Sequence, residues 1–96
     1  MPMPFVIRYD RVALAELKGL RGTERASITR EIRKQLAREP RTCTGRKKEI
    51  VRETGESVWQ LRLGEYRIFC DVDEIRREVL VRRVLYKGRQ RTEDIL

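Results

Sequence analysis

The chain has 96 residues, with 23 Lys and Arg against 15 Asp and Glu, no His, and a formal net charge of +8. This length predicts one domain over residues 1–96, and the positive excess favours an anionic partner, nucleic acid above all. The lack of His excludes Ser–His and Cys–His catalysis and His-based metal sites.

Two further exclusions concern cofactors and membranes. Cys43 and Cys70 are far apart with no His nearby, so we expect neither a metal nor another cofactor. No apolar run approaches the roughly 20 residues that span a bilayer. The segment 1–10 is too short and too quickly charged for a signal peptide, which predicts a cytoplasmic protein with no membrane partner.

The first half of the chain predicts a short strand and two helices. The strand is Phe5–Tyr9, and Asp10 is a good N-cap for a helix that extends to about Leu20. Thr23 can cap a second helix that reaches about Glu39, where the following proline stops it. The expected apolar stripes are Ala13, Leu14, Leu17 and Leu20 on the first helix, and Ile28, Ile32 and Leu36 on the second.

The second helix also carries a basic row, Arg30, Lys34 and Arg38, at helical spacing. We expect a solvated face there, with a second contact surface as the alternative. A polar stretch follows, with a short strand expected over 49–51.

Residues 59–73 predict a β-hairpin. Two alternating segments flank Gly64-Glu65, and Gly in the first loop position suits a type II′ turn. If Leu63 pairs with Tyr66, the partners follow by counting outward. These pairs are Arg62 with Arg67, Leu61 with Ile68, Gln60 with Phe69, and Trp59 with Cys70.

The two faces of this hairpin differ. The face from Trp59 to Val72 is apolar and must be covered, which makes Cys70 a core residue rather than a reactive thiol. On the other face, Arg62 and Arg67 stand opposite each other, an arrangement that costs roughly 0.2–1 kcal/mol without a ligand. It indicates an anion site; alternatively, both side chains extend into water or a carboxylate such as Asp71 separates them.

A last strand over 78–85 is apolar on both faces, which suits an interior position. The resulting order, β-α-α-β-β-β-β, predicts an α+β fold. A two-helix hairpin packs on one face of a small, mainly antiparallel sheet, and the face with the arginine pair stays partly open.

The order of elements and two segments together resemble the RelE/ParE toxin superfamily of bacterial type II toxin–antitoxin systems. The segments are the hairpin LRLGEYRIFCDVDE and the closing VLYKGRQRTEDIL. The resemblance implies the RelE-like microbial RNase fold and a cognate antitoxin. RelE-like members cut mRNA in the ribosomal A site through the 2′-hydroxyl, without a metal, and inhibit translation, whereas ParE-like members inhibit DNA gyrase. A third reading is a basic nucleic-acid-binding module without activity.

The resemblance also assigns residues. Arg67 matches the arginine of the family's Gly-Tyr-Arg type motif, Arg62 a basic position before the turn, and Arg89 the arginine after the last strand. Gln60 occupies a position where the ribosome-dependent nucleases often have Lys. Ile95 occupies the position where they often have the aromatic residue or His that acts as the base. Tyr86, Glu93 and Asp94 are therefore the alternative bases. The expected catalytic set is Arg62, Arg67, Arg89 and Tyr86, and the expected RNA-binding set is Gln60, Phe69, Lys87, Arg91, Lys47 and Lys48.

Alternatives remain for several of these residues. Arg67 can contact phosphate or form an ion pair with Asp71 or Asp73, and Tyr86 can serve packing instead of catalysis. Phe69 can stack on a base or seat the antitoxin. The +8 charge predicts that the antitoxin segment that wraps the toxin is acidic.

Overall fold

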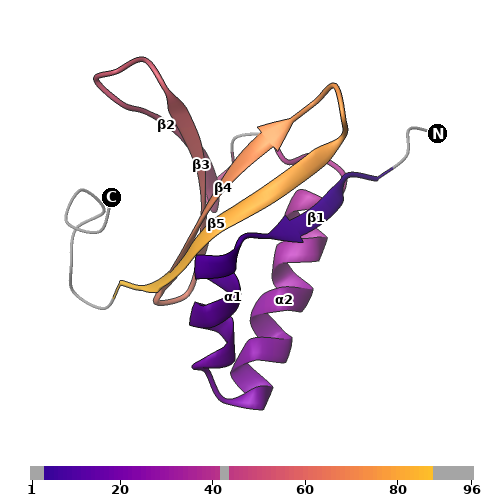
Figure 1. Cartoon of the computed structure of the whole chain (residues 1–96), viewed down its shortest axis with the longest axis vertical. Helices are drawn as coiled ribbons and strands as arrows, with labels where there is room; N and C mark the ends of the chain where they lie inside the picture. Colours follow the sequence, from indigo (N-terminus) through magenta and orange to yellow (C-terminus); the bar gives the residue numbers. More distant parts are fainter. Residues whose placement is uncertain (1–3, 42–43, 88–96) are drawn as a thin grey trace.

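A computed structural model of the chain describes residues 4–41 and 44–87. The five strands form one sheet in the order β1-β5-β4-β3-β2, in which β1 is parallel to β5 and the other neighbours are antiparallel. Figure 1 shows both helices on one side of this sheet, as predicted. The elements are β1 (Val6–Tyr9), α1 (Arg11–Lys18), α2 (Gly22–Leu36), β2 (Lys47–Val51), β3 (Ser57–Leu63), β4 (Tyr66–Asp73) and β5 (Glu78–Tyr86).

Helix α1 begins where the sequence predicted and ends two residues early. The side chain of Asp10 accepts a hydrogen bond from the backbone N–H of Ala13 at 2.9 Å, which confirms the N-cap. Ala13 and Leu17 are buried against the sheet, but Leu14 is 43% exposed. The prediction of Leu14 as a core residue was wrong because the helix turns the i and i+4 positions inward and places Leu14 on the flank.

Helix α2 differs from the prediction at both ends. It begins at Gly22, and its N-cap, Arg21, makes no side-chain capping bond, so Thr23 lies inside the helix rather than at its cap. It ends at Leu36 instead of about Glu39. The predicted stripe of Ile28, Ile32 and Leu36 is buried, and the basic row Arg30, Lys34 and Arg38 is exposed.

The central hairpin has the predicted register. Leu63 pairs with Tyr66, Arg62 with Arg67 and Trp59 with Cys70 across β3 and β4. Gly64 has φ of +59°, and among the described residues only Arg77 combines a side chain with positive φ. A positive φ confined to the first loop residue fits the predicted type II′ turn.

The bounds and the pairing of the other strands differ in part from the prediction. β2 covers Lys47–Val51, two residues longer than expected, and β5 extends to Tyr86. β5 lies between β1 and β4, which confirms its interior position. The parallel pairing of β1 with β5 joins the two ends of the described chain.

The core lies between the helices and the apolar face of the hairpin. Trp59, Leu61, Ile68 and Cys70 are at most 6% exposed, so this face is covered as predicted. Burial, with Asp71 nearby, raises the pKa of the Cys70 thiol to about 12, which agrees with a core residue rather than a nucleophile. Cys43 lies outside the described residues.

The opposite face of the sheet is less open than predicted. Gln60, Arg67 and Phe69 are 4%, 7% and 2% exposed, respectively. Figure 1 shows β2 and β3 inclined away from β4 and β5. Because the twisted sheet curves, its inner residues are enclosed and side chains at its edges form the walls of hollows.

Candidate functional site

The site is built on two facing arginines at the turn end of the hairpin. Arg62 on β3 and Arg67 on β4 are direct cross-strand partners. Neighbouring segments flank this pair on both sides. The carbonyl of Arg46 accepts a hydrogen bond from the N–H of Arg62, and Leu85 on β5 is paired with Arg67. Alternation along each strand therefore places both guanidinium groups on the face away from the helices.

Arg67 is held by the turn itself. Its Nη1 donates to the carbonyl oxygens of Gly64 at 2.7 Å and Tyr66 at 2.9 Å. Burial and the neighbouring charge of Arg62 lower its pKa from the usual value. The alternative of an ion pair with Asp71 or Asp73 was wrong. Asp71 pairs with Arg82 at 2.8 Å, and Asp73 accepts from two backbone N–H groups.

Around this pair lies a cavity of about 140 Å³, here called the basic hollow. Its walls come from the start of β2, from β3 and β4, and from the residue after β5. No Asp or Glu is among its lining residues in the described part of the chain. The lining residues are Gly45, Arg46, Lys47, Lys48, Gln60, Arg62, Arg67 and Lys87.

The predicted RNA-binding residues reach the hollow to different degrees. Lys48 and Gln60 are cross-strand partners on the same face as the arginine pair, and Lys87 follows β5. Lys47 differs, because it is opposite Leu61 on the helix side of the sheet. Its Nζ donates to the carbonyl oxygens of Gln35 at 2.8 Å and Glu39 at 2.6 Å. The ammonium of Lys47 thus supports the end of α2, which corrects its assignment as an RNA contact.

Tyr86 does not join the arginine pair. It is paired with Tyr66, one position beyond the pair of Arg67 and Leu85, so its side chain belongs to the helix face. The two tyrosine rings meet edge to face with their centroids 5.6 Å apart, and Tyr66 donates to Glu24 of α2 at 3.2 Å. The expectation that Tyr86 acts as the base beside the arginines is corrected by this register.

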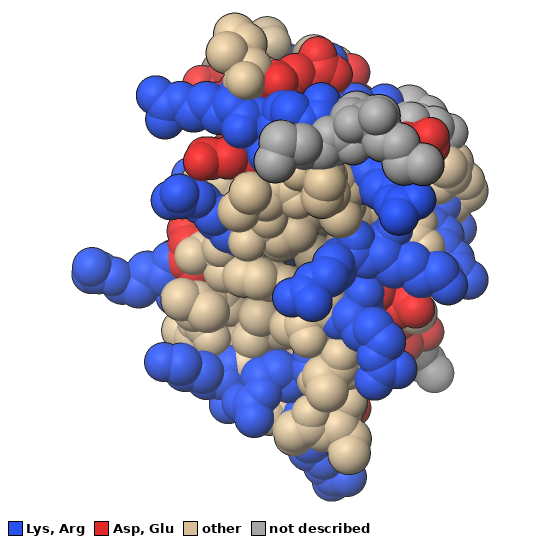
Figure 2. All heavy atoms as spheres, turned by 90° about the vertical axis from the view of Figure 1, so that its right-hand side faces the viewer, with Lys and Arg blue, Asp and Glu red and all other residues tan. Residues whose placement is uncertain are grey.

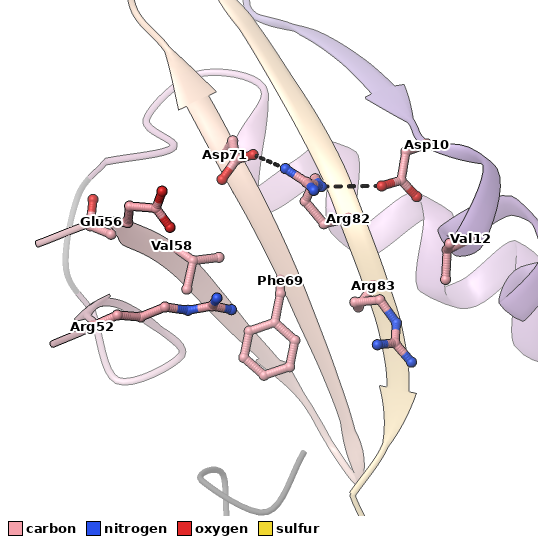
Figure 3. Close-up of a pocket in the computed structure, with 10 residues that line it drawn as sticks. Asp10, Val12, Arg52, Glu56, Val58, Phe69, Asp71, Arg82 and Arg83 are labelled. Atoms are coloured by element: carbon pink, nitrogen blue, oxygen red, sulfur yellow. Dashed lines mark hydrogen bonds and ion pairs between the residues drawn. The ribbon is translucent and has the colours of Figure 1, made fainter. Parts of the chain in front are cut away.

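Phe69 is in a second hollow of about 290 Å³ on the same sheet face, drawn in Figure 3. At 2% exposure its ring is not presented for stacking on a base, which corrects that expectation. A register shift between Phe69 and Cys70 gives β5 one extra residue, Arg82, next to Arg83. Bulges of this kind re-aim side chains.

The two β5 arginines at this bulge were not predicted as functional residues. Arg82 bridges Asp10 and Asp71, and Arg83 pairs with Glu16 of α1 at 3.0 Å. These carboxylates raise the pKa of both arginines. Two adjacent arginines in an apolar strand were the only sign in the sequence that these residues are special. Their carboxylate partners come from distant parts of the chain, so the sequence did not reveal the ion pairs.

Several predicted residues lie outside the described part of the chain: Arg89, Arg91, Glu93, Asp94 and Ile95. Within the described residues, no three His, Cys, Asp or Glu side chains gather in a way that could hold a metal ion. The same part of the chain contains no helix that is long and apolar enough to cross a membrane. On the face shown in Figure 2, Lys and Arg spread around a strip of uncharged surface, while Asp and Glu occupy smaller areas.

The structure is similar to a chain in the crystal structure of the RelBE2 toxin–antitoxin complex from Mycobacterium tuberculosis. The TM-score is 0.75 at 24% sequence identity, over 92% of this chain and 97% of that chain. The fold is RelE-like. This RelE-like fold confirms, at the level of the fold, the resemblance predicted from the hairpin and the closing segment. No protein-family model matches the sequence, and no curated protein matches it.

Proposed function

We propose that this chain is the toxin of a bacterial type II toxin–antitoxin system and acts in the cytoplasm as a ribosome-dependent mRNA endonuclease. The basic hollow is the observation that carries this proposal. It holds two facing arginines, and no carboxylate is among its described lining residues. Guanidinium groups match phosphate oxygens in geometry and stay charged at neutral pH. The RelE-like fold supports the same assignment.

In the proposed reaction, the 2′-oxygen of a ribose attacks the adjacent phosphorus and the bond to the 5′-oxygen breaks. The 2′-hydroxyl loses a proton and the leaving oxygen gains one. Arg62, Lys48 and Lys87 stabilise the negative charge that develops on the phosphoryl oxygens. The described lining side chains include no His and no carboxylate, the groups that most often act as a general base. We therefore assign the proton transfers to groups outside the hollow, including the ribosome.

The proposed protein partner is an antitoxin whose acidic segment covers the cationic sheet face. Electrostatic attraction between exposed charges is screened by salt. The affinity of the complex should therefore fall as ionic strength rises. An affinity that is the same at low and high salt would contradict this assignment.

Inhibition of DNA gyrase is a second candidate function. The position of Tyr86 on the helix face favours it, because this places the candidate base away from the arginine pair. A toxin that acts by binding alone needs no proton transfer. The two functions give different products in cells, namely cut mRNA or broken DNA.

The test is to induce the chain without an antitoxin in a bacterial host and to map mRNA 5′ ends across the transcriptome. Arg62→Ala is the better loss-of-function variant, because Arg62 is exposed whereas Arg67 supports the turn. Arg76→Ala is a matched control. It removes the same charge from an exposed position in the turn that follows β4.

New mRNA ends at in-frame codon positions, lost with Arg62→Ala and kept with Arg76→Ala, are the expected result. Growth arrest with intact mRNA and an SOS response would instead support inhibition of DNA gyrase as the function. Normal growth with intact mRNA would point to a binding module or to a toxin that has lost its activity.

A further inference from the structure

Gln60 occupies a special position in the basic hollow. It lies on β3 between Lys48 of β2 and Phe69 of β4, its direct cross-strand partners. Its side chain is on the face that carries the arginine pair, and Gln60 lines the hollow. Gln60 is nevertheless only 4% exposed. A group that binds to its amide is therefore shielded from bulk water.

The carbonyl oxygen of this amide has no partner among the described residues. Oε1 of Gln60 is fully buried and makes no hydrogen bond with the described residues. Buried acceptors are almost always paired, because an unpaired one destabilises the folded state. Because Gln60 lines the hollow, a rotation of its amide would bring this unpaired acceptor to a donor that enters the cavity.

The other charged side chains that line the hollow offer donors and no acceptors. Arg46, Lys48, Arg62, Arg67 and Lys87 are donors without acceptor capacity. A phosphodiester group has only acceptor oxygens, so it satisfies these donors and leaves Gln60 Oε1 unpaired. A ligand that satisfies both the donors and this acceptor therefore carries phosphate oxygens with a hydroxyl donor next to them.

We propose that Gln60 selects RNA over DNA by accepting a hydrogen bond from the ribose 2′-hydroxyl beside the phosphate held in the basic hollow. In RNA, this hydroxyl is the donor that lies next to the 3′-phosphate, and DNA lacks it. This assignment rests on the proposed function, since it takes the ligand to be RNA. An amide oxygen is not basic at neutral pH, so Gln60 recognises the hydroxyl when RNA binds. The hydroxyl proton leaves this hydrogen bond when the base outside the hollow takes it.

The test uses the purified full chain and three oligonucleotides of one sequence: RNA, DNA and 2′-fluoro RNA. The 2′-fluoro sugar keeps the ribose-like pucker and small size but has no hydroxyl to donate. Dissociation constants are measured by fluorescence anisotropy at one salt concentration, and a gel after each titration shows that the RNA is intact. We expect RNA to bind roughly 5- to 10-fold more tightly than either analogue, the usual effect of one hydrogen bond.

Two variants make the test specific. Gln60→Met removes the acceptor and nearly keeps the volume, so RNA should fall to the affinity of 2′-fluoro RNA. Arg62→Ala should weaken all three ligands alike and leave the ratio between RNA and its analogues unchanged, because phosphate is common to them.

Equal binding of RNA and 2′-fluoro RNA by the wild-type chain would overturn the proposal, even if Gln60→Met failed to fold. An RNA preference that survives in Gln60→Met would overturn it as well, as would no binding of any of the three. Failure of mRNA cleavage in cells together with the expected ratio in vitro would refute the nuclease and leave the role of Gln60 in place.

Discussion

Arg62 and Arg67 face each other across two strands, yet only Arg67 is tied to the turn, through the carbonyl oxygens of Gly64 and Tyr66. One arginine therefore has a structural contact in addition to its charge. The other is exposed, and the hydrogen bond from its Nη2 to the carbonyl of Gly45 is long at 3.5 Å.

This difference predicts that the same substitution lowers stability much more at Arg67 than at Arg62. Arg67→Met should lower the free energy of unfolding by about 1–3 kcal/mol, because two carbonyl oxygens lose a charged donor. Arg62→Met should change it by less than about 0.5 kcal/mol, since an exposed side chain is lost and a like-charge contact is relieved. Urea denaturation followed by circular dichroism measures both. Equal losses of stability would contradict the assignment.

Lys47 and Lys48 form a second contrasting pair. Lys47 is 5% exposed and supports the end of α2, whereas Lys48 is exposed at the basic hollow. Lys47→Met should cost about 1–3 kcal/mol of stability. Lys48→Met should leave the melting transition nearly unchanged and weaken RNA binding at low salt. A stable Lys47→Met with poor RNA binding would reverse these roles.

Asp10 has two functions that substitution can separate. One carboxylate oxygen caps α1 and the other pairs with Arg82. Asp10→Asn keeps a good cap and loses only a surface ion pair, so it should cost at most about 1 kcal/mol. Asp10→Ala loses both and should cost about 1 kcal/mol more. Thermal unfolding of the two variants gives the difference, and identical melting temperatures would show that the cap contributes little.

The buried thiol of Cys70 predicts a loss of stability in alkali. Its pKa is raised in the folded state to about 12, whereas the usual value for a thiol is 9.0. Because the folded state holds this proton more tightly, the stabilising contribution is complete below pH 9 and declines as pH rises towards 12. The decline is at most about 1.4 kcal/mol per pH unit.

Cys70→Ala lacks this titration and serves as the comparison. The difference in unfolding free energy between wild type and Cys70→Ala should be constant below pH 9 and shrink above it. Parallel pH profiles through pH 11 would show that the thiol does not contribute.

The hairpin and most of the basic hollow could be predicted from local sequence. A two-residue loop with Gly64 fixes the register, and period-2 alternation then places Gln60, Arg62 and Arg67 on one face. No long-range information is needed for these residues.

The errors came from contacts between distant segments. α2 ends early where its last carbonyl groups meet Lys47, which is 12 residues beyond Gln35. The face of Tyr86 depends on the register between β4 and β5, and the bulge at Phe69 is invisible in the alternation of a single strand. The parallel pairing of β1 with β5 likewise has no local signal.

The parallel contact between β1 and β5 has a consequence for how the molecule folds. It brings together segments such as those of Asp10 and Arg82, 72 positions apart, whereas Arg67 bonds to a carbonyl only three positions away. Because closing a long loop costs more chain entropy than closing a short one, the hairpin can reach its register before the two ends meet. We therefore expect the arginine pair to form early and the closure that completes the sheet to be the slower step.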